Sequence, residues 1–175
     1  MDYIDQLGLR GILRVRVYDV ATGKRLQHEE KRNLVCKGAK EALVRLIAQA
    51  SVYGGSPTDD DFLHTKLWAI YAGTGSALPD VEDTVLDTVA FKKACVQPVA
   101  FSLLDGEATV QMTIESGEGN GNSFQEAGLF SRGDNDDPNA GGIADVLMYA
   151  RQLHGAIAKT SGISIEYTWR FQILV

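Results

Sequence analysis

Two glycine-rich segments have the composition of a phosphate-binding loop, residues 117–122 (GEGNGN) and residues 73–75 (GTG). A dinucleotide site needs a strand, the glycines and then a helix whose N-terminus meets the pyrophosphate. Residues 117–122 lead instead into FQEAGLF, whose short apolar pattern does not make a long helix, and no lysine follows residues 73–75. We therefore interpret residues 117–122 as a flexible hairpin tip and predict no nucleotide or other cofactor.

Two acidic loops offer oxygen ligands for a cation, residues 134–139 (DNDDPN) and residues 59–61 (DDD). Calcium takes roughly six to eight oxygens, which a loop of this kind can supply. The ordered spacing of an EF-hand is missing from both segments, and neither is flanked by a helical pattern. Solvated turns are the favoured interpretation, with calcium binding as the alternative, and we predict no metal site.

No catalytic set stands out among the nucleophilic and titratable residues. His28, His64 and His154 are scattered, without a partner at metal-ligand spacing. Cys36 and Cys95 lie in apolar settings, where a free thiol behaves as a small buried hydrophobe, and they suit a reducing compartment. No serine lies in a G-x-S-x-G turn. Triads are recognised by geometry, so sequence order leaves one open, but the residues favour a protein that is not an enzyme.

The bulk composition bounds the function further. The chain of 175 residues is 45% apolar and 23% charged, which fits one globular domain. A net charge of −6 argues against nucleic-acid binding, which depends on lysine and arginine neutralising phosphates. The apolar runs are far shorter than the ~20 residues of a membrane span, and the first residues lack the apolar core of a secretion signal. We expect a protein of a cytoplasm or of a particle assembled there.

The N-terminal region predicts a β-hairpin preceded by an arm. Leu13, Val15 and Val17 alternate with polar residues at the period of a half-buried strand. The turn ATGK and the segment RLQHEEKRNLV complete a hairpin over residues 11–35. The basic residues in and just before the hairpin alternate with apolar ones and are interpreted as its solvent-facing side, with a local basic patch as the alternative. These are Arg10, Arg14, Arg16, Lys24, Arg25, Lys31 and Arg32. Residues 1–10 form the predicted arm, with Ile4, Leu7 and Leu9 as interface candidates.

One amphipathic helix is expected over residues 38–50, before Gly54 and Gly55. Its apolar positions recur at spacings of three and four residues. They are Ala39, Ala42, Leu43, Leu46, Ile47 and Ala50. A helix with one apolar side packs against a sheet.

The remaining elements are predicted as strands and loops. Strands are expected over residues 66–76, once or twice within 89–106, and over 107–116, 124–131, 143–153 and 163–175, with connectors at 77–89 and 155–162. Trp169 and Phe171 of the last strand suit a core better than base stacking, because only Arg170 lies close to them. The fold class is mainly β (α+β), an antiparallel sandwich-like domain of residues 11–175 with one helix packed on it.

The order of several segments resembles a family of phage tail and tail-fibre-associated proteins. The segments are NLVCKGAKEALVRLIA, LWAIYAGTGSALPDVEDTVL, FQEAGLFS and IAKTSGISIEYTWRFQIL. The landmark residues that carry the resemblance are Asn33, Gly38, Gly73, Thr74, Gly75, Glu126, Gly128, Phe130, Lys159, Thr160, Glu166 and Trp169. The hairpin before Asn33 is not part of it, and the order Glu166-Tyr167-Thr168-Trp169 departs slightly from the closing pattern of the family.

The resemblance implies a structural component of the virion, near the baseplate or the site of fibre attachment, without catalytic residues. Its partners would be other virion proteins and further copies of itself, as a trimer or a hexamer. Two alternatives stay open. One is a head decoration or vertex protein. The other is a module that binds or hydrolyses carbohydrate through Tyr53, Trp68 and Tyr71.

Overall fold

A computed structural model describes residues 8–48, 67–96, 100–102, 106–131 and 146–174. The elements in chain order are β1 (Gly8–Asp19), β2 (Arg25–Val35), α1 (Lys37–Ala48), β3 (Leu67–Gly73), β4 (Val89–Ala94), β5 (Ala100–Ser102), β6 (Glu107–Ile114), β7 (Ser123–Ser131), β8 (Met148–Ala158) and β9 (Ile163–Leu174).

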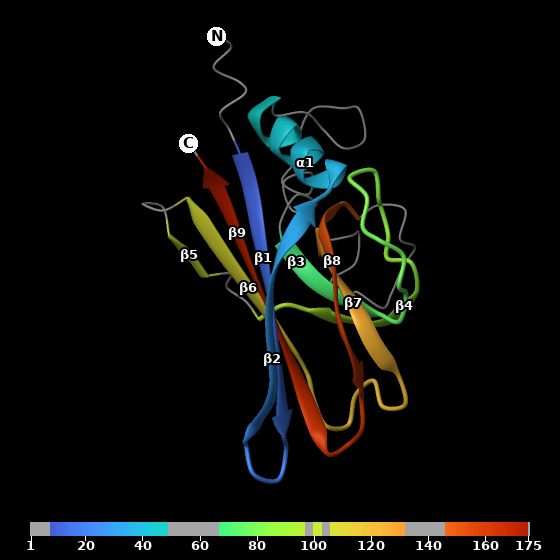
Figure 1. The fold of residues 1–175 in the computed structure, drawn as a ribbon. Coiled ribbons are helices and arrows are strands. Elements are labelled where there is room, and N and C mark those ends of the chain that lie inside the picture. Colours follow the sequence, from blue (N-terminus) through green and yellow to red (C-terminus); the bar gives the residue numbers. More distant parts are fainter. Residues whose placement is uncertain (1–7, 49–66, 97–99, 103–105, 132–145, 175) are drawn as a thin grey trace.

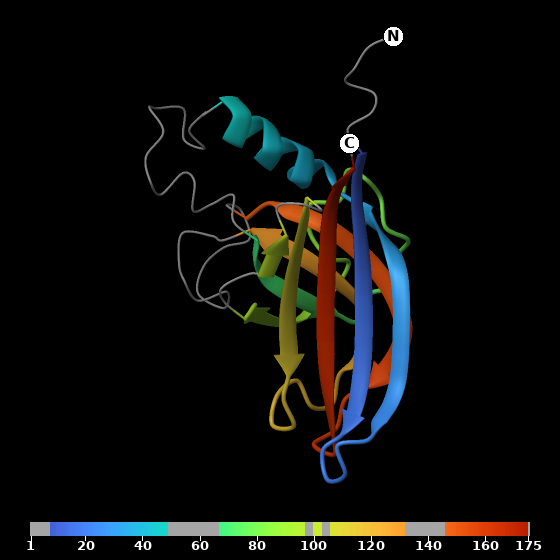
Figure 2. The ribbon, with the colours of Figure 1, turned by 90° about the vertical axis from the view of Figure 1, so that its left-hand side faces the viewer.

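The nine strands form one antiparallel sheet that folds back on itself. Their order is β4-β3-β7-β8-β2-β1-β9-β6-β5, and β2 and β8 join the two halves. That junction is short, since β2 pairs with β8 only at Leu34–Arg151 and Val35–Ala150. On the opposite side the Val96 amide donates to the carbonyl of Gln111 in β6, so the sheet is nearly closed. Figure 2 shows β6, β9, β1 and β2 in front of β8, β7 and β3. The predicted sandwich-like, mainly β fold is confirmed.

The core lies between the two halves of the sheet. Alternate residues of the last strand point inward, and Ile165, Tyr167 and Trp169 are completely buried. From the other half, Ile70 and Leu129 meet them in the same apolar cluster. The strand alternation of residues 163–175 therefore predicted the inward-facing side correctly over the described part.

The hairpin of β1 and β2 is confirmed, but its first strand starts earlier than predicted. Gly8, Leu9 and Arg10 pair with Leu174, Ile173 and Gln172 of β9, so β1 begins at Gly8 and the predicted arm of residues 1–10 is too long. The turn is held by the Asp19 carboxylate, which accepts from the amide and the hydroxyl of Thr22 at 2.7 Å each.

The helix α1 covers one end of the sheet beside β8 (Figure 1). It begins at Lys37, one residue before the predicted start, and it is described as far as Ala48. Ala39 and Ala42 are buried, as the predicted apolar side requires, and the side chains from Leu43 onward lie outside the described set. A Cβ at Gly38 would lie 2.5 Å from the Met148 carbonyl oxygen, so glycine permits this close approach of α1 to β8.

Two predicted connections are wrong. Residues 155–158 were expected in a connector, yet β8 continues to Ala158 because Ile157 and Ala158 pair with Phe124 and Ser123 of β7. Residues 117–122 were expected at a hairpin tip, yet the strands on either side are not neighbours: β6 pairs with β9, and β7 with β3 and β8. The glycine-rich loop therefore crosses from one half of the sheet to the other.

Candidate functional site

The landmark residues Gly73, Gly75 and Glu126 form one buried cluster, although Glu126 of β7 lies far from the two glycines in the sequence. The side chain of Glu126 is completely buried. Its Oε1 accepts from the amides of Gly75 at 3.0 Å and Thr88 at 2.8 Å, and its Oε2 accepts from the Asp87 amide at 3.1 Å. One carboxylate thus fixes both ends of residues 74–88, which join β3 to β4. We call residues 74–88 the connector.

Arg151 of β8 supplies the counter-charge. It is 3% exposed, and its guanidinium donates to Glu126 Oε2 at 3.1 Å, to Asp83 Oδ2 at 2.6 Å and to the Ala77 carbonyl at 3.0 Å. Burial opposes the charged form, but the hydrogen bond to Asp83 and the charge of Glu126 outweigh it and raise the pKa of Arg151. Arg151 therefore stays charged and ties the middle of the connector to the sheet.

Glycine is required at two positions beside this carboxylate. A Cβ at Gly73 would lie 2.4 Å from Glu126 Oε1 and 2.5 Å from the Thr88 carbonyl oxygen. A Cβ at Gly75 would lie 2.5 Å from the same Oε1. All three distances are shorter than ordinary van der Waals contact, and the Thr88 carbonyl is backbone that cannot move aside freely.

Gly73→Ala is expected to lower the free energy of unfolding by about 1–3 kcal/mol, because the added methyl group overpacks the Glu126 cluster. The matched control is Gly117→Ala, where a Cβ meets nothing within 4 Å. An exposed change of this kind stays within about 0.5 kcal/mol of wild type. Urea denaturation of both variants measures the difference, and equal stabilities would contradict the packing described here.

The firmly held connector exposes apolar side chains. Leu78 is 84% exposed, and Val81 and Val85 are 42% and 40% exposed. Local bonds add to the anchoring: Asp87 Oδ2 accepts from the amides of Ser76 and Ala77 at 3.1 Å and 3.3 Å. A loop fixed by buried charges but apolar outside has the properties of a binding surface.

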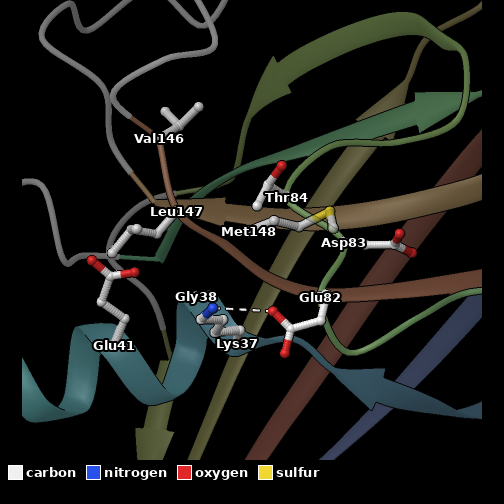
Figure 3. A pocket seen from close by; sticks show the side chains of 9 residues that line it. All are labelled: Lys37, Gly38, Glu41, Glu82, Asp83, Thr84, Val146, Leu147 and Met148. Atoms are coloured by element: carbon white, nitrogen blue, oxygen red, sulfur yellow. Dashed lines mark hydrogen bonds and ion pairs between the residues drawn. The ribbon is translucent and has the colours of Figure 1, made fainter.

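A pocket of about 210 Å³ lies between the connector, the first turn of α1 and the approach to β8 (Figure 3). It is lined by Lys37, Gly38 and Glu41 from α1, by Glu82, Asp83 and Thr84 from the connector, and by Val146, Leu147 and Met148. Lys37 and Glu82 form an ion pair at 3.0 Å on its rim. The pocket combines an apolar wall with carboxylates, which suits a long basic side chain.

Lys159 performs a structural role at the other end of the molecule. It is 2% exposed, and its ammonium donates to the Ser116 carbonyl, Asn120 Oδ1 and the Thr160 carbonyl at 2.8–3.3 Å. Its backbone pairs with Gly121 and Asn122 as well. The landmark lysine therefore holds the glycine-rich loop of residues 117–122 in place.

The other landmarks are also explained by packing. Phe130 stacks on Tyr71 with ring centroids 4.1 Å apart, and a Cβ at Gly128 would come within 2.8 Å of this ring. Glu166 pairs with Arg16 at 2.8 Å. The side chain of Asn33 occupies the space that a Cβ on Gly11 would need. Asn33, Glu166 and Trp169 do not converge on the Glu126 cluster, whereas Gly128 lies opposite Arg151.

Both cysteines and one of the carbohydrate candidates, Tyr71, are buried. Cys36 and Cys95 are buried free thiols, and burial raises the pKa of each to about 12, so neither is a thiolate at neutral pH. Tyr71 is buried against Phe130 and Trp68 is half-buried, whereas Tyr53 lies outside the described residues. Leu9 lies in β1, and Ile4 and Leu7 also fall outside the described residues, as do both acidic loops of residues 59–61 and 134–139.

His154 is the buried histidine of the described core. Its Nδ1 donates to the Gly155 carbonyl at 2.8 Å, so its Nε2 accepts from the Tyr167 hydroxyl at 3.2 Å. Burial lowers the pKa of His154 below its ordinary value of 6.5, while Glu29 and Glu126 oppose this shift and Lys31 adds to it. The neutral ring is therefore the form that the fold accommodates.

The free energy of unfolding is expected to fall as the pH drops from about 7 to about 5. His154 binds a proton more readily in the unfolded state than in the folded state, where burial disfavours the charged ring. The contribution of neutral His154 to stability is complete above the pKa of this residue in the unfolded state. It is lost as the pH falls through that pKa toward the lower pKa of the folded state. His154→Gln keeps a donor and an acceptor but does not titrate, so it should flatten this slope. The exposed His28 gives the control His28→Gln, which should retain it. A wild-type slope in His154→Gln would refute the assignment.

Sequence reasoning missed Arg151, Asp83 and the exposed connector. Arg151 gave a usable signal, since it follows Met148, Tyr149 and Ala150 in a predicted apolar strand, where a charge needs a buried partner. The connector gave one too, because Leu78, Val81 and Val85 alternate there with acids.

Comparisons with known proteins found no matching family model, no matching curated protein and no matching solved structure. In the part of the chain that the structure describes, no helix is long and apolar enough to cross a membrane. The same residues contain no group of three or more histidine, cysteine, aspartate or glutamate side chains placed to hold a metal ion.

Proposed function

We propose that the chain is a structural protein of a bacteriophage virion, in the tail, the baseplate or a tail fibre, and that it is not an enzyme. In this role it assembles with neighbouring virion proteins and with further copies of itself, as a trimer or a hexamer. The main support is the resemblance of the landmark segments together with the connector. Glu126 and Arg151 anchor the connector from inside the fold, and its outer side exposes Leu78, Val81 and Val85.

The buried polar groups support an assembly role over a catalytic one. Glu126, Arg151 and Lys159 each use their hydrogen-bonding atoms to fix a loop. A group engaged in this way is not poised to bind or transfer a proton at a substrate. Tyr71 does not support the carbohydrate-binding alternative, because its ring is buried against Phe130 and is not accessible to a sugar.

Immunogold electron microscopy of intact particles from the phage that encodes the chain tests the proposal. Antibody raised against the purified protein is expected to place gold at the tail tip, the baseplate or the fibres. Gold over the head would favour the decoration protein instead. Particles without gold, under conditions in which antibody to a known tail protein labels them, would refute a virion role.

A further inference from the structure

Two exposed surfaces contain most of the large apolar side chains that face solvent. We call residues 20–26, at the turn between β1 and β2, the hairpin tip. Six large apolar residues are exposed in the described part of the chain. Val20 and Leu26 lie on the hairpin tip, and Leu78, Val81 and Val85 lie on the connector, which leaves only Val96 elsewhere. Five of the six thus lie in two short segments, and exposed apolar residues that gather in patches mark interaction surfaces.

The charges on the two surfaces are complementary. The hairpin tip offers two cations, Lys24 and Arg25, against the single nearby carboxylate of Asp19, which is hydrogen-bonded to Thr22. The connector contains four carboxylates, Asp80, Glu82, Asp83 and Asp87, and among the described residues the cations paired with them are Lys37 and Arg151. The tip therefore has an excess of positive charge, and the connector has an excess of negative charge.

The two surfaces lie at opposite ends of the same strand. The hairpin tip leads into the first residues of β2, an eleven-residue strand. The connector is bonded just past the other end of β2, where the Lys37 amide donates to the Val81 carbonyl at 2.8 Å. At ~3.3 Å per residue the strand separates them by about 33 Å. Figure 1 shows the hairpin tip pointing away from the end that holds α1 and the connector. Within one chain, the surfaces are too far apart to meet.

We propose that the hairpin tip of one copy docks on the connector of a second copy. Val20 and Leu26 pack against Leu78, Val81 and Val85, so that both apolar surfaces leave water together. Lys24 or Arg25 of the docked tip then reaches the pocket beside the connector. There its aliphatic stem meets Leu147 and Met148, and its charged group meets Glu82.

Both partner surfaces are already formed in a single copy. The connector is held by Glu126 and Arg151, and the hairpin tip is tied to the neighbouring turn by the Val20 amide, which donates to the Gly162 carbonyl at 2.9 Å. Little ordering entropy is then lost on binding. Because the two surfaces differ, each docked pair leaves one tip and one connector free, so further copies can add to build a ring or a filament.

This inference deepens the proposed function by naming a second copy as a partner, and it is tested on purified protein without any particle. Sedimentation velocity over a range of concentrations should show oligomers that grow with concentration. A tip variant, Arg25→Glu with Leu26→Ser, and a connector variant, Leu78→Ser, should each weaken association by about tenfold or more. The matched control is Val96→Ser, which removes the exposed apolar residue outside both surfaces and should associate as wild type does.

Mixing the two variants gives the sharpest outcome. The tip variant keeps its connector and the connector variant keeps its tip, so the mixture has one intact contact and should form a one-to-one dimer that grows no further. A wild-type protein that stays monomeric throughout, variants that associate normally, or a mixture that stays monomeric would each overturn the proposal. If the purified protein stays monomeric while immunogold still labels the tail, the proposed contact between copies is wrong and the proposed virion role is not.

Discussion

Arg151→Met is expected to lower the free energy of unfolding by about 3–5 kcal/mol, because it leaves a buried carboxylate without its counter-charge. Glu126 is completely buried and lies 2.9 Å from the guanidinium of Arg151. The variant also removes the bonds to Asp83 and to the Ala77 carbonyl, so the middle of the connector is released. Guanidinium chloride denaturation followed by tryptophan fluorescence measures the loss.

The control for this prediction is a second arginine–glutamate pair of the same chain. Arg14 and Glu30 lie 2.8 Å apart on the outer side of the hairpin, with both side chains partly exposed. Arg14→Met should cost no more than about 1 kcal/mol, since water and salt screen an exposed pair. Adding Glu126→Gln to Arg151→Met should restore part of the loss by removing the stranded charge. If both arginine variants cost the same small amount, the buried pair does not hold the connector as described.

Trp169→Ala is expected to cost about 3–5 kcal/mol, because it empties the centre of the core. Trp169 is completely buried in β9, between Leu13 of β1 and Val110 of β6. Trp169→Phe should cost less than about 1.5 kcal/mol. Phenylalanine fills most of the space, and the indole N–H has no hydrogen-bond partner among the described residues, so no bond is lost. Urea denaturation compares the two variants, and similar losses for both would show that the indole N–H contributes more than its packing suggests.

Strands such as β9 could be predicted because their residues alternate between a side that faces the core and a side that is more exposed. Alternation in residues 163–175 identified Ile165, Tyr167 and Trp169 as inward-facing, and all three are buried. The same reasoning failed for residues 155–158. Gly155 and Ala156 lower the apolar signal there, yet pairing with β7 extends the strand, and such pairing depends on residues more than thirty positions away.

The candidate site was harder to predict, because its parts come together only through the order of the strands. Gly73, Gly75 and Glu126 were recognised as landmarks, but nothing in their spacing says that β3 and β7 are neighbours. That adjacency brings Glu126 beside the two glycines, and the pairing of β7 with β8 adds Arg151 opposite Gly128. Exposure is a property of the finished surface, so the role of Leu78 could not be read from its residue type.

The pairing of β1 with β9 along its whole length means that the sheet cannot be completed before β9 has been made. Gly8 lies opposite Leu174, and twelve successive pairs join the two strands. A ribosome releases β1 and β2 first, and they can form their local hairpin at once. The other edge of β1, which pairs with β9 in the finished sheet, stays unpaired until β9 has emerged. Until that strand has been made, the open edge of β1 is available for pairing with other chains, as exposed strand edges are in general.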